Sequence, residues 1–472
     1  MLPLITGAVE DRSARGIAAA VSRLVTAGRL QPGARLPTVR DVARELGVSP
    51  TTVSEAWQSL ARAGAIQTRG RSGTFVAAPV LPRQSWRYSQ LGGPAAAVSR
   101  DSSSPAAENR MRLRDFSTGI PDHDLLPDLT EALKRIGDGR VTSSYLDAPV
   151  LPRLEAVLLE RWPFPPEQLT VVDGALDALD RIVGAVVRFG DHVVVENPTF
   201  APVLDLLQTV GATVVGVPVD DAGMAPDELR AVLAEHRPVA LFLQPRAHNP
   251  TGVSMPAARA AELAGIVAGI PDLLVVEDDH AGDVASAPPV SVGQFLPERT
   301  VHVASFSKSH GPDLRLAAVG GPAHVISAVA DRRLLGPGWS SRLLQGVLLD
   351  LLTDPAAIAQ VAAARDAYAS RRATLLARLR DRGVTATAAD GINLWLTVDD
   401  QQIAMVTLAA HGVAVAPGAP FCVTPLGADH VRVTVGLVAG DFDDLADVLA
   451  SAAILDSRGS GSRARSHPRS WR

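Results

Sequence analysis

The first 78 residues carry apolar positions at the spacing of helix faces, followed by two short runs with strand character. Ile17, Val21 and Leu24 recur every three or four residues, which predicts an amphipathic helix. Gly47 is a favourable carboxy-terminal cap, and Ser49 is an N-cap residue placed before a proline. The pattern therefore predicts helices over residues 10–30, Val39–Leu46 and Ser49 to about Ala63, and a hairpin of Ala65–Thr68 with Thr74–Ala77.

From Phe116 to about Leu455, apolar runs alternate with loops and helical segments. Most of these runs are apolar throughout, as in parallel strands that are buried on both faces. The alternation predicts an α/β fold with a parallel sheet, followed after about Ala363 by a long helix and a smaller subdomain. The expected strands are Leu169–Val172, His192–Glu196, Thr213–Val217, Val239–Leu243, Leu273–Glu277, Val301–Ser305 and Ala317–Gly320, with two more near Asn393–Val398 and Val431–Gly436.

Changes in composition mark the expected domain boundaries. A stretch rich in Pro, Ser, Ala and Gly without periodicity predicts a linker, and the Ser/Gly/Arg-rich end of the chain predicts a disordered basic tail. The predicted organisation is a helical domain over 1–78, the linker over 79–110, a large domain over 111–362, a small subdomain over 363–456 and the tail over 457–472.

Charge is distributed unevenly, although the formal net charge is only −5. Residues 1–78 contain ten arginines and five acidic residues, so the rest of the chain is acidic. A basic end on an acidic body is typical of a protein that binds nucleic acid through that end.

Cysteine content and hydropathy bear on the cellular compartment. Cys422 is the only cysteine, which excludes an intramolecular disulfide and fits a reducing cytosol. We find no signal-peptide pattern at the amino terminus and no apolar run of about 18 residues. We therefore expect a cytoplasmic protein without a membrane span, and we predict no metal site.

The two short helices around Gly47-Val48-Ser49 predict a helix-turn-helix. The amino-terminal, polar end of the second helix usually faces base edges in the major groove of double-stranded DNA. Arginines before this helix and on the hairpin are placed to contact phosphates on either side. The alternative is a small interaction module with solvated arginines. The expected DNA-binding residues are Ser49, Thr51 and Thr52 at the bases, and Arg35, Arg40, Arg69 and Arg71 at the phosphates.

The amino-terminal sequence resembles the GntR family of winged helix-turn-helix regulators. The resemblance covers residues 10–77 and rests on Leu36-Pro37-Thr38-Val39-Arg40-Asp41-Val42-Ala43 and on Gly73-Thr74-Phe75-Val76. The family usually has arginine after the serine that opens the recognition helix, whereas this chain has Pro50. The operator preference of relatives therefore does not carry over to this chain.

Polar residues follow the ends of several expected strands, where open parallel sheets bind their ligands. Gly174-Ala175 opens a helix, so its backbone N–H groups suit an anion. Ser305-Phe306-Ser307-Lys308 ends one strand, and Arg315 follows seven residues later. Other strand ends carry Glu196-Asn197-Pro198-Thr199-Phe200, Asn249-Pro250-Thr251-Gly252 and Asp278-Asp279.

These groups match what pyridoxal phosphate (PLP) requires. The aldehyde of PLP needs a lysine amine for a Schiff base, and only Lys134 and Lys308 are present in the chain. The pyridine nitrogen needs a carboxylate, which Asp278 or Asp279 supplies. The phosphate needs a helix terminus, hydroxyl groups and a guanidinium.

The set resembles fold-type I aminotransferases, and with the amino-terminal domain it resembles the MocR subgroup of the GntR regulators. The resemblance implies a PLP-binding large domain whose Schiff-base lysine is Lys308. It also implies that Asp278 pairs with the ring nitrogen and that Arg432 binds the carboxylate of an amino acid. The remaining implied cofactor contacts are Asn249 at the phenolic oxygen, Phe200 on the ring, and Gly174, Ala175, Ser305, Ser307 and Arg315 at the phosphate.

The chain departs from that family in two places. The family has tyrosine two residues after the nitrogen-pairing Asp278, and here the residue is His280. Imidazole can donate a hydrogen bond to the phenolic oxygen, but it ordinarily titrates near neutral pH. The segment after Tyr145 also lacks the glycine that is common before the Leu-Arg pair.

We interpret the chain as a PLP-dependent transcription regulator that binds operator DNA as a homodimer and senses PLP or an amino compound. The first alternative is a working aminotransferase with an appended DNA-binding domain, since every catalytic part is present. The second is a regulator that holds no PLP and senses another ligand. Because His280 perturbs the group that tunes Schiff-base chemistry, we favour PLP itself as the signal. The sequence does not distinguish activation from repression.

Overall fold

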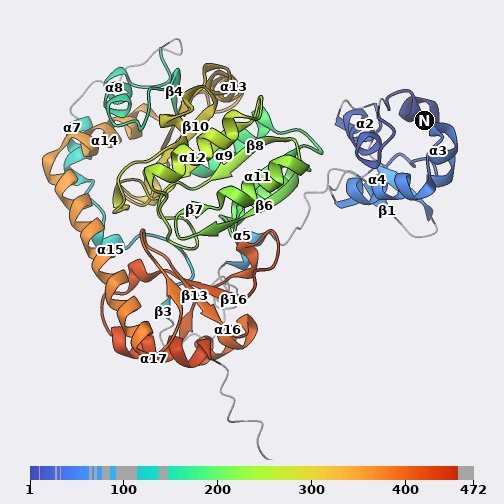
Figure 1. Ribbon diagram of the computed structural model, residues 1–472. Helices are drawn as coiled ribbons and strands as arrows, with labels where there is room; N and C mark the ends of the chain where they lie inside the picture. Colours follow the sequence, from blue (N-terminus) through green and yellow to red (C-terminus); the bar gives the residue numbers. More distant parts are fainter. Residues whose placement is uncertain are drawn as a thin grey trace, which may run out of the picture.

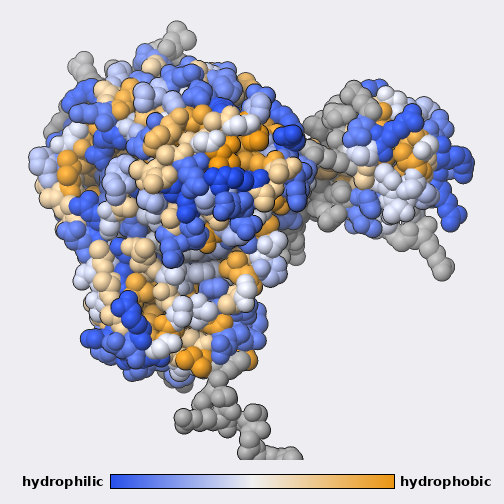
Figure 2. Space-filling view, viewed as in Figure 1, coloured by the Kyte–Doolittle hydropathy of each residue, from blue (hydrophilic) through white to orange (hydrophobic). Residues whose placement is uncertain are grey.

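The computed structural model describes residues 1–9, 11–26, 29–31, 33–62, 66–68, 72–76, 86–91, 114–137 and 147–454. Figure 1 shows a small amino-terminal unit beside a larger body, in which a twisted sheet with helices on it lies above a smaller carboxy-terminal subdomain. Arg69, Arg71, Tyr145 and the predicted tail lie outside the described residues. Apolar side chains gather on the upper half of the viewed face of the body, and polar ones surround them (Figure 2).

The amino-terminal unit has the three helices and the hairpin that the apolar spacing predicts. Thr38 caps the second of these helices through the backbone N–H of Asp41, and Gly47 ends it with a φ of 68°. One short helix was not predicted, because five residues are too few to show a period; its Ile5 is fully buried. The elements are α1 (Leu2–Thr6), α2 (Ala14–Thr26), α3 (Val39–Leu46), α4 (Pro50–Arg62), and the antiparallel strands β1 (Ile66–Thr68) and β2 (Thr74–Val76).

The body contains an eight-stranded sheet of order β4-β11-β10-β9-β8-β5-β6-β7. All seven predicted strands of the sheet are present, and β7 is additional. Their bounds are β4 (Gln168–Val172), β5 (His192–Asn197), β6 (Thr213–Asp220), β7 (Gly223–Met224), β8 (Pro238–Leu243), β9 (Leu274–Asp279), β10 (Thr300–Ser305) and β11 (Ala317–Gly321).

The prediction of a parallel sheet is right for the central strands and wrong for β11. This strand runs antiparallel to both β10 and β4, and the short β7 runs antiparallel to β6. The sequence of β11 did not reveal its direction, because Ala317–Gly321 is buried throughout, like the parallel strands. A strand that is buried on both faces is apolar whichever way it runs.

Helices cover both faces of the sheet and explain the continuous apolar runs. On β5, Val193 and Val195 pack in one core with Leu179, and Val194 packs in the opposite core with Leu263. Successive side chains therefore enter different cores, so each position of the strand must be apolar. The first core receives α9 (Ala175–Val186), α10 (Ala201–Thr209) and α13 (Ala323–Leu334), and the second receives α11 (Pro226–Glu235) and α12 (Ala257–Ala268).

The carboxy-terminal subdomain is built on a four-stranded sheet of order β12-β13-β16-β15. The long helix α15 (Pro355–Asp381) leads into it, so the boundary predicted after residue 362 falls inside this helix. Arg114–Asp115, which forms β3, pairs with β14 of this subdomain. The other elements are β12 (Ala386–Thr387), β13 (Leu394–Val398), α16 (Gln401–Ala410), β14 (Val413–Ala414), β15 (Ala416–Pro417), β16 (Asp429–Val433) and α17 (Phe442–Ala453).

The remaining α-helices of the described ranges are α5 (Arg87–Gln90) within the predicted linker, and α7 (Thr130–Gly137), α8 (Pro152–Glu160) and α14 (Arg342–Thr353) in the body. Within the described ranges, no single helix is long and apolar enough to cross a bilayer. Only α14 and α15 together meet that length and composition, and they are bent by 76° relative to each other.

Candidate functional site

The structure brings the candidate lysine and the candidate carboxylate-binding arginine to the same edge of the sheet. Lys308 follows β10, and its Nζ donates a hydrogen bond to the carbonyl of Gly119. Burial, together with the positive charge of Arg432, lowers the pKa of Lys308 to about 8. A substantial fraction of this amine is therefore neutral, and hence nucleophilic, at slightly alkaline pH.

Arg432 is buried on β16 and reaches across to the large domain. Its Nη1 donates to Oδ1 of Asn249 over 3.1 Å, and its Nη2 donates to the carbonyl of Ser117. Because Arg432 occupies Oδ1 of Asn249, the Nδ2 end of this amide is the donor available to a phenolic oxygen.

The adjacent carboxyl groups of Asp278 and Asp279 have different environments. Asp278 is buried, and its Oδ1 has no hydrogen-bond partner among the described residues. Burial, with the charge of Asp279 next, raises the pKa of Asp278 to about 7. For Asp279, burial opposes ionisation, but the charges of Arg246 and His302 and the hydrogen bond from Arg246 together outweigh it, so the pKa is lowered. An unpaired buried carboxyl group at the site fits a protonated pyridine nitrogen as its missing partner.

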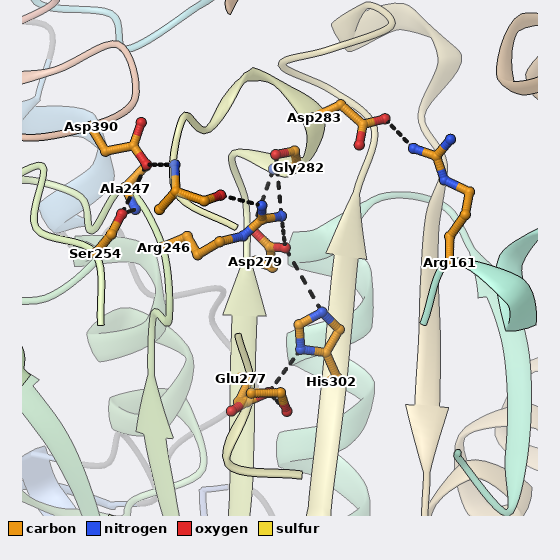
Figure 3. Close-up of polar contacts among 12 residues, drawn as sticks. Arg161, Arg246, Ala247, Ser254, Glu277, Asp279, Gly282, Asp283, His302 and Asp390 are labelled. Atoms are coloured by element: carbon orange, nitrogen blue, oxygen red, sulfur yellow. Dashed lines mark hydrogen bonds and ion pairs between the residues drawn. The ribbon is translucent and has the colours of Figure 1, made fainter. Parts of the chain in front are cut away.

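Arg246 ties the loop after β8 to the loop after β9, as Figure 3 shows. Its Nη2 lies 2.5 Å from Oδ2 of Asp279 and 3.2 Å from the carbonyl of Gly282. On the neighbouring strand, Nδ1 of His302 lies 2.8 Å from Oε2 of Glu277, which extends the buried polar cluster. The cluster fixes Asp279 on the side away from Asp278.

A cavity of about 310 Å³ borders this cluster on the same side as His302. The charged groups that line it are paired with one another: Arg246 with Asp279, and Arg161 with Asp283 at 2.6 Å. In Figure 3, Arg161 and Asp283 lie to the right of Arg246 and Asp279. The lining therefore offers no uncompensated charge to a ligand.

His280 differs from the expectation drawn from its residue type. Burial, with the charge of Lys308 next, lowers the pKa of His280 to about 4, so the ring is neutral at physiological pH. Its Nε2 lies 2.9 Å from the carbonyl of Ala247, which can only accept, so Nε2 carries the proton. Nδ1 is then an acceptor, and this tautomer does not donate to a phenolic oxygen through Nδ1.

The candidate phosphate residues gather around the start of α9. Gly174 precedes this helix with a φ of 104°, and a Cβ there would lie 3.0 Å from Nη2 of Arg315. Arg315 also donates to the carbonyl of Asp173 over 3.0 Å. On the neighbouring strand end, the backbone N–H of Ser307 lies 3.4 Å from Oγ of Ser305. Backbone N–H groups from Ala175 onward, two hydroxyls and one guanidinium suit a phosphate.

Phe200 immediately precedes α10 and is half-buried against the core of the large domain. The backbone N–H of the preceding Thr199 donates to the carbonyl of Phe421 over 2.8 Å. This bond joins the loop of the candidate stacking ring to the carboxy-terminal subdomain.

Sequence reasoning missed several residues that shape this site. Arg246 lies in a bend after β8, and Phe421 ends a three-residue 3-10 helix, so neither showed a periodic or motif signal in the sequence. Arg87 lies in the predicted linker, where the aromatic pair Trp86 and Tyr88 was the available sign that the segment packs on something.

On the amino-terminal unit, Arg35, Arg40 and Thr51 are exposed, as DNA contacts require. Oγ of Ser49 accepts from the backbone N–H of Thr52 over 3.1 Å and lies 2.8 Å from its hydroxyl. Ser49 therefore caps the candidate recognition helix, in addition to any contact that it makes with bases.

Comparisons with known proteins agree with both parts of the chain. Residues 13–76 match the family described as bacterial regulatory proteins, gntR family, and residues 112–449 match aminotransferase class I and II. The chain is 34% identical to the vitamin B6 salvage pathway transcriptional repressor PtsJ of Salmonella typhimurium, over 88% of this chain and 93% of that protein. It is 30% identical to the probable rhizopine catabolism regulatory protein MocR of Rhizobium meliloti, over 82% and 79% respectively.

Among solved structures, the fold is similar to that of LysN, the α-aminoadipate aminotransferase of Thermus thermophilus. The TM-score is 0.65 at 24% identity, and the match covers 76% of this chain and 97% of LysN. That structure contains N-(5'-phosphopyridoxyl)-L-leucine. The likeness establishes a fold-type I aminotransferase fold for the body.

Proposed function

The chain belongs to the MocR subgroup of the GntR transcription regulators, and on that premise we propose that its affinity for operator DNA depends on PLP. The amino-terminal winged helix-turn-helix binds DNA, and the aminotransferase-like body uses PLP as its cofactor. The signal that we propose is occupancy of the body by PLP itself. The relative PtsJ is named for repression in vitamin B6 salvage, which supports a vitamin B6 signal here as well.

The single observation that carries the proposal is the buried, unpaired Oδ1 of Asp278 beside Lys308. An unsatisfied buried carboxyl group is unfavourable, and a pyridinium nitrogen would relieve it. When bound, PLP supplies an aldehyde that bonds to an amine and a ring that accepts electrons. In the proposed arrangement, Asp278 holds the ring nitrogen, Lys308 holds the aldehyde carbon, and Gly174, Ser305, Ser307 and Arg315 hold the phosphate.

We propose that His280 favours the binding of PLP over the turnover of substrates. A neutral ring that donates to the carbonyl of Ala247 offers only an acceptor to the cofactor side. A phenol-like donor at this position would instead stabilise a charged phenolic oxygen on PLP. The tautomer inferred from the contact with Ala247 therefore suits a site that binds PLP more than one that turns over substrates.

A second candidate is regulation by an amino acid, or transamination of one. The observation that favours it is Arg432, which is buried at the site and presents a guanidinium that can pair with a carboxylate. In this version, Arg432 would bind the carboxylate of an amino acid whose amino group competes with Lys308 for PLP. Steady-state turnover of common amino and keto acids distinguishes transamination from sensing.

We propose that the protein acts in the cytoplasm as a homodimer that binds two half-sites. Large apolar side chains remain exposed where α13 ends and α14 begins: Leu334 is 64%, Leu335 81% and Leu343 53% exposed. Association of two bodies through such a surface would remove it from water. Sedimentation of the PLP-loaded protein as a monomer at micromolar concentration would contradict this part of the proposal.

Selection of bound fragments from sheared genomic DNA, with and without added PLP, tests the function. We expect a small set of fragments to be enriched, and their recovery to change when PLP is added. The Lys308→Ala variant should enrich the same fragments without a PLP response. Equal recovery with and without PLP from the unmodified protein would contradict PLP sensing.

A further inference from the structure

The short helix α5 lies within the predicted linker, yet it is bound to the body. Arg87 donates from Nη1 to the carbonyl of Cys422 over 2.8 Å and to that of Pro420 over 3.3 Å. Its backbone N–H donates to Oδ1 of Asp205 over 3.2 Å. Since Asp205 is on α10 and the two carbonyls belong to the carboxy-terminal subdomain, α5 bridges the two parts of the body.

Leu91, at the end of this segment, adds an apolar contact. It is 7% exposed and packs in one cluster with Ala201, Trp395 and Phe421. Burying a leucine side chain contributes about 2 kcal/mol relative to leaving it exposed, which favours docking of the segment. The segment 86–91 therefore has both a polar and an apolar attachment to the body.

Both attachments lead directly to candidate cofactor residues. Ala201 follows Phe200, the candidate stacking ring, and begins α10. Phe421 lies under the guanidinium of Arg432, with 5.1 Å between the guanidinium carbon and the ring centroid. The carbonyl of Phe421 also accepts from the backbone of Thr199. Leu91 is thus linked to Phe200 through Ala201 and to Arg432 through Phe421.

We propose that the segment 86–91 positions Phe200 and Arg432, on two sides of the PLP site. PLP occupancy and docking of α5 on the body then stabilise each other. This inference rests on the proposed function and specifies how the signal leaves the site. If docking strengthens PLP binding by some factor, PLP strengthens docking by the same factor, because the coupling free energy between two sites is reciprocal.

Docking sets the length of chain available to the DNA-binding unit. The last described residue of that unit is Val76, and Trp86 is ten residues further along the chain. If α5 leaves the body, the next described point on the body is Arg114, which is 38 residues from Val76. Fully extended chains of these lengths reach at most roughly 35 Å and roughly 130 Å.

A docked α5 therefore keeps each DNA-binding unit within roughly 35 Å of its attachment to the body, whereas an undocked α5 allows roughly 130 Å. In a dimer, docking narrows the range of half-site separations that the two DNA-binding units can span. By this route, PLP occupancy changes the DNA geometry that the protein can bind without any contact between PLP and DNA.

The test measures PLP affinity and linker cleavage in the full-length protein without DNA. Arg87→Ala removes the bonds to Pro420 and Cys422, and Arg87→Ala with Leu91→Ser also removes the apolar contact. We expect PLP binding, followed by visible absorption, to weaken about five-fold or more in these variants. We also expect PLP to protect the chain between Val76 and Arg114 from limited proteolysis in the unmodified protein and much less in the variants.

The matched control is Arg299→Ala. Arg299 also donates to backbone carbonyls, those of Val267, Ala268 and Ile270, but it precedes β10 at the edge of the sheet opposite the site. Its loss should lower thermal stability without changing PLP affinity. If the single and double variants bind PLP as tightly as the control does, or if PLP leaves cleavage unchanged, the coupling is wrong even though PLP binds. Absence of PLP binding in the unmodified protein would instead contradict the proposed function.

Discussion

Arg246 and Asp279 form a buried ion pair, with 2.5 Å between Nη2 and Oδ2. Because of this pair, the adjacent carboxyl groups of Asp278 and Asp279 have different roles. Asp279 is held by the guanidinium on one side of β9. Asp278, one residue earlier, remains buried with an unpaired oxygen at the candidate cofactor site. By position in the sequence, either Asp278 or Asp279 could pair with the pyridine nitrogen. Because Asp279 is already paired with Arg246, the structure favours Asp278.

Replacing Arg246 with methionine should destabilise the protein strongly. The change leaves Asp279 buried without its cation, which typically costs about 3–5 kcal/mol. We expect a lower thermal midpoint and weaker PLP binding, because the loops after β8 and β9 also lose their bridge. Arg230→Met breaks exposed pairs with Asp227 and Glu262 and should cost only about 1 kcal/mol or less. Equal losses in the two variants would contradict the role given to Arg246.

The raised pKa of Asp278 predicts a pH dependence for the stability of the PLP-free protein. Between the ordinary value of 3.8 and about 7, the folded protein binds a proton at Asp278 that the unfolded chain has lost. Stability due to this group therefore falls as pH rises through that window, by at most about 4 kcal/mol.

Asp278→Asn removes this titration and serves as the comparison, because His280 and His310, with pKa values lowered to about 4, act in the opposite direction. We expect the variant to gain stability relative to the unmodified protein as pH increases from about 4 to about 7 in denaturant titrations. A constant difference between the two proteins across this range would contradict the assigned pKa.

Lys308→Ala should abolish the visible absorption that PLP acquires when it is bound to a lysine, and reduction by borohydride should no longer attach the cofactor. Lys134→Ala is the matched control, since Lys134 is the only other lysine and pairs with Glu131 on an exposed helix face. In the unmodified protein, PLP association should accelerate as pH rises through about 8, where Lys308 loses its proton. An unchanged spectrum in Lys308→Ala would contradict the assignment of this lysine.

Arg35→Ala and Arg40→Ala should each weaken DNA binding to a similar extent on all sequences. If both residues contact phosphates, each loss should reduce the slope of log K against log salt concentration by about 0.9. Arg153→Ala, on an exposed position of α8 in the body, should leave that slope unchanged. A change in base preference with an intact salt slope would show that the arginine reads bases instead.

Much of the fold followed from the sequence, because burial repeats with the period of the element. The helices of the amino-terminal unit and all seven predicted strands of the large sheet were confirmed. The direction of β11 did not follow, because a fully buried strand lacks an orientation signal. Nor did the docking of α5, which depends on carbonyls of Pro420 and Cys422 more than 300 residues away.

The candidate site was predictable where chemistry demands one residue type, as with Lys308. It was not predictable where a side chain acts through its neighbours. The pairing of Arg246 with Asp279 and the tautomer of His280 depend on the geometry of two separate loops, after β8 and after β9. The role of these residues in binding PLP stays a prediction. So do the binding of a carboxylate by Arg432 and the contacts of Arg35 and Arg40 with DNA.

The most direct test of the account is the affinity of the full-length protein for a fluorescent operator fragment, measured by anisotropy at fixed salt with and without saturating PLP. We predict that PLP changes the dissociation constant by about five-fold or more, corresponding to about 1 kcal/mol of differential binding, and that Lys308→Ala shows no such change. An unmodified protein that binds PLP stoichiometrically, and binds the operator equally well with and without it, would contradict the central claim.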